Sequence, residues 1–149
     1  MLAWPTSAKP TNLATSLDYA ARVLSHHSIV FVISDFVTPA IDRQLRMLSQ
    51  RHDLVAVVLD DPGERTLPNL GVSRLVDAES GRLVEIDTSD AGVRERYVSA
   101  IDDERATRKQ LLRRLAIDEV IVRTEDGWAE PLLRFFNTRG IRGRRLRRR

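Results

Sequence analysis

Hydrophobic and polar positions follow two different patterns along this chain. Residues 12–24 place leucine and alanine at spacings of three and four, which predicts an amphipathic helix with Thr11 or Asn12 as its N-cap. Residues 28–33 are instead a serine followed by a continuous run of β-branched and aromatic side chains. Such a run is too short for a typical helix and is apolar on both faces, so it predicts a buried parallel strand.

The same order of elements then repeats. Thr38 and Pro39 begin a predicted helix whose apolar residues recur near one face, and residues 54–59 form a second buried run. A strand, a helix and a strand in succession predict two parallel strands joined by a right-handed crossover.

The second half of the chain has a different pattern. Residues 72–76 and 83–86 predict a β-hairpin, and residues 91–115 predict a long charged helix with a narrow apolar stripe. A third short strand is expected over residues 119–123, and a final helix over residues 130–136. The fold class predicted by this pattern is α/β, with a mostly parallel sheet flanked by helices and a hairpin insertion near residues 72–87.

Composition narrows this picture to one domain. The chain has 149 residues, of which 42% are hydrophobic and 30% charged, so it is long enough for a single core. It contains no cysteine, and this excludes disulfides and thiolate metal sites. Since no apolar run has the length of a membrane span or a signal peptide, we expect a cytoplasmic protein.

The positive charge of the chain is concentrated at one end. The net charge is +3, yet seven arginines lie within residues 139–149, so the rest of the chain has a net charge of −4. We therefore predict a domain over residues 1–138 and an arginine-rich tail over residues 139–149. The alternative function that this tail predicts is electrostatic binding to nucleic acid or an anionic membrane. The polyanion contacts would be Arg142, Arg144, Arg145, Arg147, Arg148 and Arg149.

Motifs that carry enzyme chemistry are missing from the sequence. There is no phosphate-binding glycine loop, no dinucleotide turn and no nucleophile elbow. Asp60 and Asp61 precede Pro62-Gly63, and this pattern predicts a solvated turn in which the two carboxylates point apart. The histidines stand near predicted helix ends and form no ligand cluster. We expect a protein that is not an enzyme.

Several short strings, taken in order, resemble domain-of-unknown-function family 58. Their order along the chain is more specific than any one of them. The strings are Thr11-Asn12-Leu13, Ser34-Asp35-Phe36, Arg51-His52-Asp53, Leu67-Pro68 with Gly71, and Asp77-Ala78-Glu79-Ser80-Gly81. The resemblance covers nearly the whole chain and ends at Phe135-Phe136 before the basic terminus.

The resemblance implies a partial Rossmann-like fold of the von Willebrand factor A type. Such domains bind a divalent cation through three loops at the carboxyl edge of the sheet. Thr11 matches the threonine loop and Asp35 the late aspartate, which implies an incomplete site for Mg²⁺ or another divalent cation, weak or absent in this chain. The Asp-x-Ser-x-Ser motif expected before Thr11 is missing. The segment from Asp87 to Ala91 resembles it, but its position before a helix favours N-capping.

A missing first strand also has a consequence for the sheet. In this architecture it would pair with residues 28–33, so we predict an open apolar edge there and a truncated or split gene product. A homodimer or a partner strand would cover that edge. The resemblance implies a non-enzymatic protein-interaction module that works with a MoxR-type AAA+ ATPase in protein assembly or maturation. A further alternative is a gene fragment without independent function.

Overall fold

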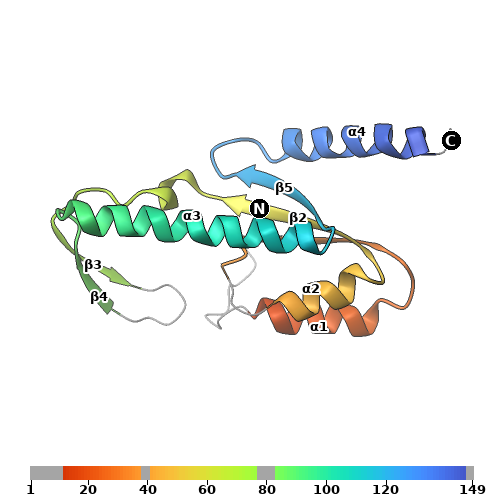
Figure 1. Ribbon diagram of the computed structural model, residues 1–149, viewed down its shortest axis with the longest axis horizontal. Helices are drawn as coiled ribbons and strands as arrows, with labels where there is room; N and C mark the ends of the chain where they lie inside the picture. The colour runs from red at the N-terminus through yellow and green to blue at the C-terminus, as the bar shows by residue number, and fades with distance from the viewer. Residues whose placement is uncertain (1–11, 38–40, 77–82, 147–149) are drawn as a thin grey trace, which may run out of the picture.

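The protein is described here by a computed structural model, which covers residues 12–37, 41–76 and 83–146, with side chains through Arg139. These residues form four helices, a three-stranded sheet, a separate hairpin and one short 3₁₀ turn (Figure 1). In chain order the elements are α1 (Leu13–Val23), β1 (Ile29–Ser34), α2 (Asp42–Ser49), β2 (Asp53–Asp60), η1 (Pro62–Arg65), β3 (Val72–Val76), β4 (Leu83–Asp87), α3 (Ala91–Arg114), β5 (Asp118–Arg123) and α4 (Ala129–Leu146).

The main sheet is parallel and has the strand order β1-β2-β5. Ile29 pairs with Asp53 across one side of β2, and Val55 pairs with Asp118 across the other. The middle strand is therefore bonded on both edges, and its residues from Leu54 to Val58 are all buried. This arrangement confirms the predicted α/β class with a mostly parallel sheet flanked by helices, as in a partial Rossmann-like fold.

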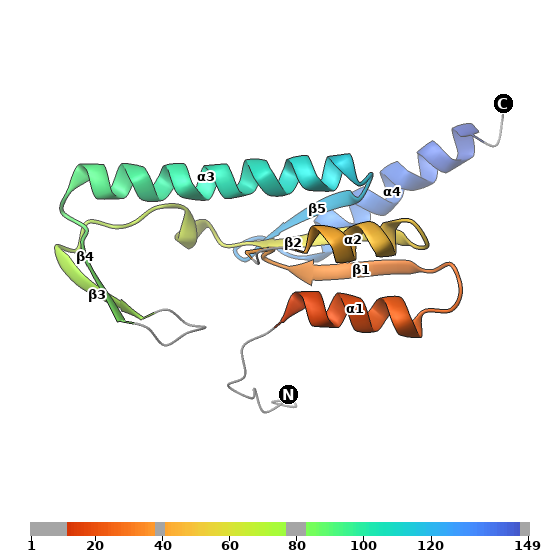
Figure 2. The same ribbon diagram turned by 60° about the horizontal axis from the view of Figure 1, so that its bottom comes forward.

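Three helices cover one face of this sheet. Leu17 of α1, Leu45 and Leu48 of α2 and Leu112 of α3 pack with inward-facing residues of β1 and β2 in the larger of two cores. Figure 2 shows these helices arranged along the sheet. The predicted cap of α1 is Asn12, whose side chain accepts a hydrogen bond of 3.0 Å from the backbone N–H of Thr15. Thr11, the other predicted cap, lies outside the described residues, as do Thr38 and Pro39.

Helix α4 covers the opposite face only in part. Leu132 and Phe135 pack on four valines of β2 and β5, which form the second core. Phe136 reaches β1, where its ring lies 5.9 Å from that of Phe31. The outer face of β1 is otherwise bare, because Ile29 and Ile33 are 56% and 64% exposed.

The long helix α3 extends past the carboxyl end of the sheet. It has 24 residues, and its amino-terminal half carries the antiparallel β3–β4 hairpin away from the sheet, as both views show. The hairpin confirms the prediction for residues 72–76 and 83–86, although its turn lies outside the described residues. Thr88 is buried and donates a 2.7 Å hydrogen bond to the Gly71 carbonyl, closing the base of the hairpin.

The predicted capping role of the segment before α3 is confirmed. Asp90 is the N-cap, and its carboxylate accepts a 2.7 Å hydrogen bond from the N–H of Gly92. At the other end of α3, Ala116 adopts a left-handed backbone with φ of 54° while the N–H of Ile117 bonds to the Leu112 carbonyl. This geometry ends the helix and turns the chain into β5.

The last helix is longer than the sequence pattern predicts. A helix was expected over residues 130–136, but α4 continues from Ala129 to Leu146, so the predicted boundary between residues 138 and 139 falls inside it. Gly140 and Gly143 lower the helix propensity of this stretch, so the sequence pattern does not predict that the helix continues. The arginines around them favour a helix. Within the described residues, no helix is both long and apolar enough to cross a bilayer.

The larger core predicts a contrast between two positions of α2. Leu45 is fully buried, whereas Met47 is 39% exposed. We expect Leu45→Ala to lower the free energy of unfolding by about 2–5 kcal/mol because it leaves a cavity. Met47→Ala should cost less than about 1 kcal/mol, since little apolar area is lost there. Urea unfolding of both variants tests this, and equal losses would contradict the assignment of the core.

Candidate functional site

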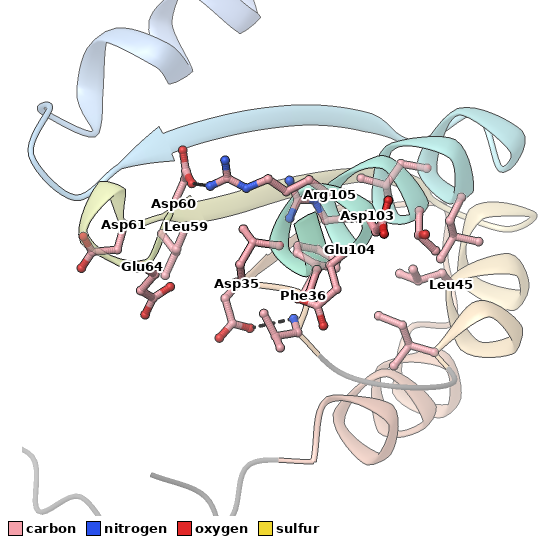
Figure 3. A pocket seen from close by; sticks show the side chains of 18 of the residues that line it. Asp35, Phe36, Leu45, Leu59, Asp60, Asp61, Glu64, Asp103, Glu104 and Arg105 are labelled. Carbon is pink, nitrogen blue, oxygen red and sulfur yellow. Dashed lines mark hydrogen bonds and ion pairs between the residues drawn. The ribbon is translucent and has the colours of Figure 1, made fainter. Parts of the chain in front are cut away.

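A cavity of about 740 Å³ lies at the carboxyl ends of β1 and β2, beside α3. Four segments contribute to it: the loop after β1, the start of α2, the end of β2 with η1, and the middle of α3 (Figure 3). In parallel α/β sheets, ligands are bound at this end of the strands. Its position and size, within the usual range for ligand cavities, make it the candidate site.

A buried carboxylate, Asp60, lines this cavity and connects the elements around it. It stands at the end of β2, is 8% exposed, and its two oxygens bond to Arg65 of η1 and Arg105 of α3. The guanidinium of Arg123, at the end of β5, lies 4.0 Å away. One side chain therefore connects four elements of the fold through charge-assisted contacts.

These arginines determine the charge state of Asp60. Burial favours the neutral acid and raises the pKa, but the hydrogen bond from Arg65 and the positive charges of Arg105, Arg65 and Arg123 outweigh it, so the pKa of Asp60 is lowered. The hydrogen bond to Asp60 in turn raises the pKa of Arg65. Asp60 is consequently ionised at neutral pH and unsuited to act as a general acid.

The loop after β1 holds a second carboxylate in a fixed place. Asp35 is exposed, and its Oδ1 accepts hydrogen bonds from the Val37 N–H at 3.1 Å and the Ser34 hydroxyl at 3.2 Å. Phe36 between them has a φ of 60°, a left-handed conformation that is strained for a bulky side chain. Strain of this kind is concentrated at functional sites, and here it turns the chain sharply at the cavity.

The cavity lining carries excess negative charge. Seven acidic residues line it, against two arginines. Both arginines have partners, because Arg105 bonds to Asp60 and Arg108 lies 3.4 Å from Glu119. Among the described residues, five of the acids form no ion pair; they are Asp35, Asp61, Glu64, Asp103 and Glu104.

The predicted metal ligands are not brought together within the described residues. Asp35 lies at the cavity, but Thr11 is outside the described part of the chain. No group of three histidine, aspartate or glutamate side chains there has the arrangement of a metal site. The described residues thus do not fit a bound cation by themselves, and the pair Thr11 and Asp35 stays a prediction.

The predicted turn is confirmed at Asp61, whereas the predicted solvation is wrong for Asp60. Asp61 caps the turn as predicted, accepting a 2.8 Å hydrogen bond from the N–H of Gly63. The solvation predicted for both is wrong for Asp60, because Arg65 and Arg105 enclose it. Its position directly after a buried strand is the one signal that could have found it. His52 is buried at the opposite end of β2 and does not join the site.

The first arginine of the predicted tail is fixed to the body of the protein. Arg139 bonds to Asp53, lies 3.4 Å from Asp118, and stacks on the ring of Phe135 at 5.5 Å. The side chains of Arg142, Arg144 and Arg145 lie outside the described part of the chain, as do Arg147, Arg148 and Arg149 entirely.

These features define an α/β protein with a parallel sheet and an acidic cavity at its strand ends. The chain belongs to the family described as "Protein of unknown function DUF58", which matches residues 2–107. An uncharacterized protein of Mycobacterium avium is 31% identical over 129 residues, which cover 86% of this chain and 76% of that protein. Uncharacterized proteins of Mycobacterium bovis and Mycobacterium tuberculosis are 30% identical over 86% of this chain. The matched part spans 40% of those two proteins. No solved structure matches the chain.

The charge network predicts how stability depends on pH. Because the folded-state pKa of Asp60 is lowered, its contribution is present above its unfolded pKa of about 3.9 and is lost as the pH falls through the folded pKa. At pH 7, Asp60→Asn should lower the free energy of unfolding by about 1–3 kcal/mol. The difference from the wild type should shrink below about pH 4.

The matched control for this change is the adjacent residue. Asp61→Asn retains an oxygen that caps η1, so the variant should unfold at nearly the wild-type denaturant concentration. Urea titrations from neutral to acidic pH measure both variants. If the difference in the free energy of unfolding between Asp60→Asn and the wild type did not change with pH, the paired charge of Asp60 would contribute nothing to stability.

Proposed function

We propose that this chain is a non-enzymatic protein-interaction module of the von Willebrand factor A type. In this proposal it works with a MoxR-type AAA+ ATPase in the assembly or maturation of other proteins. The observation that carries the proposal is strand β1, which joins a sheet edge that is unpaired among the described residues to an exposed apolar face. Membership of a family of unknown function is compatible with this role and leaves the partner to be identified.

The edge of β1 has the properties of a docking strand. Among the described residues β1 pairs only with β2, so the main-chain groups along its other side are free to bond another chain. Natural edge strands are usually protected by charges, prolines or bulges. The segment from Ile29 to Ser34 carries no charged residue and no proline. Addition of a partner strand would satisfy these groups and extend the sheet.

The apolar face of the same strand adds area to such an interface. Ile29, Phe31 and Ile33 point to one face and are 56%, 42% and 64% exposed. Phe136 of α4, whose ring lies 5.9 Å from that of Phe31, is 45% exposed, and Leu133 of the same helix is 62% exposed. Contiguous apolar side chains of this kind, around an aromatic pair, are typical of protein contacts rather than of solvent-exposed surface.

A divalent cation has a minor place in the proposal. Thr11 and Asp35 would be remnants of a metal-dependent adhesion site, with Asp35 held by its own loop for that purpose. If so, Mg²⁺ or Mn²⁺ raises the melting temperature slightly, and Asp35→Ala abolishes the shift. If neither ion changes the melting temperature of the wild type, the proposed metal site is wrong, whereas the proposed docking role of β1 is unaffected.

Two lysines on β1 should abolish docking without unfolding the chain. We expect Ile29→Lys with Ile33→Lys to weaken capture of a MoxR-type AAA+ ATPase encoded in the same genome by about tenfold or more. Lysines on an edge strand oppose strand addition, while both positions are already exposed to solvent. Purified ATPase, immobilised tagged chain and binding isotherms provide the measurement.

The hairpin offers a control with the same number of charges. Val72→Lys with Leu83→Lys replaces side chains that are 65% and 61% exposed, far from β1. This variant should bind the ATPase as the wild type does, and thermal melting should show that both double variants fold. The proposal is wrong if the wild type captures no ATPase, or if both pairs of lysines reduce capture equally.

A further inference from the structure

We infer that the acidic cavity at the strand ends receives the arginine-rich carboxyl-terminal segment, residues 142–149, of a second copy of this chain. The inference concerns a different surface from β1 and stands without the proposed function. It joins two features of the molecule that have opposite charge. One is the excess of carboxylates around the cavity, and the other is the run of arginines that follows Arg139.

The cavity carries the negative charge needed to hold such a segment. Its two arginines are already bonded to Asp60 and to Glu119, so they do not neutralise the remaining lining acids. Asp103 and Glu104 are adjacent on one turn of α3, and Glu64 and Asp61 stand at the opposite side of the cavity, with Asp35 between (Figure 3). Carboxylates on several sides of a hollow raise the local concentration of a cationic ligand.

The lining also suits the composition of the segment. Between its charged groups the cavity is apolar, with Val37 and Leu59 58% and 44% exposed. Residues 142–149 consist of six arginines, one glycine and one leucine. Arginine has a long apolar stem and a planar head that bonds to carboxylates in pairs, so it satisfies both parts of the lining.

The direction of α4 makes the contact intermolecular. The strands end at the cavity, whereas α4 runs back along the sheet and carries the chain toward the opposite end, as Figures 1 and 2 show. Arg139, bonded to Asp53 near the start of β2, holds the helix in this direction. The last helical residues, up to Leu146, thus lead away from the cavity of their own chain, so the inferred contact is with the cavity of another copy.

Charge reversal on each side of the contact tests the inference in the full-length chain. The wild type should self-associate at about 50 mM NaCl and dissociate at about 500 mM, where charges are screened within a few ångströms. Asp103→Arg with Glu104→Arg should be monomeric at low salt, as should Arg144→Glu with Arg145→Glu. An equimolar mixture of these two variants should associate again, because each has one intact partner surface. Sedimentation velocity measures all four samples.

A control with equal charge change separates the cavity from net charge. Glu95→Arg with Glu125→Arg reverses two exposed acids that do not line the cavity, and it should self-associate like the wild type. Monomeric wild type at low salt, or a mixture that fails to associate, would overturn the inference. So would loss of association in the control. If the wild type stays monomeric while Arg144→Glu with Arg145→Glu weakens binding to a DNA duplex, the segment binds nucleic acid instead.

Discussion

The structure depends on the burial of β2 on both of its faces and along both of its edges. Its apolar run from Leu54 to Val58 has no polar face to turn toward water, so the chain must supply a strand on each side and helices above and below. β1 and β5 provide the edges, α1 to α3 cover one face, and α4 covers the other. The single helix on the second face encloses β2 but contacts β1 through Phe136 and leaves Ile29 and Ile33 exposed. The exposed surface of β1 follows directly from this unequal coverage.

The same burial brings charges together where the strands end. The carboxylate of Asp60, the last residue of β2, is buried, so it requires cationic partners, and they come from η1, α3 and β5. This cluster fixes the middle of α3 beside the sheet, although Leu112 is the one fully buried residue of that helix among those described. The cavity is formed between α3, the start of α2, the strained loop at Phe36 and the turn after Asp60. Its excess charge remains because the available arginines are used to hold the fold.

Much of the fold follows from local sequence patterns, but the site does not. Runs of β-branched residues identify β1 and β2, periodic leucines identify α1 and α2, and Asn12 and Asp90 mark helix starts, because each signal acts over a few residues. Asp60 was expected in solvent because its partners Arg105 and Arg123 lie far along the chain. The anchoring of Arg139 depends likewise on Asp53 and Asp118, which the sheet register brings together. The end of α4 differs from the predicted helix because Gly140 and Gly143 lower the helix propensity of a stretch that the structure shows as helical.

The exposed edge of β1 is the central claim, and hydrogen–deuterium exchange of the backbone tests it most directly. In the isolated chain, amides of β1 should exchange faster than those of β2, because one strand is open on a side where the other is enclosed. Addition of the AAA+ ATPase should slow exchange in β1 and leave the β3–β4 hairpin unchanged. The account is contradicted if β1 is as protected as β2 in dilute isolated chain, or if the bound partner protects the hairpin instead.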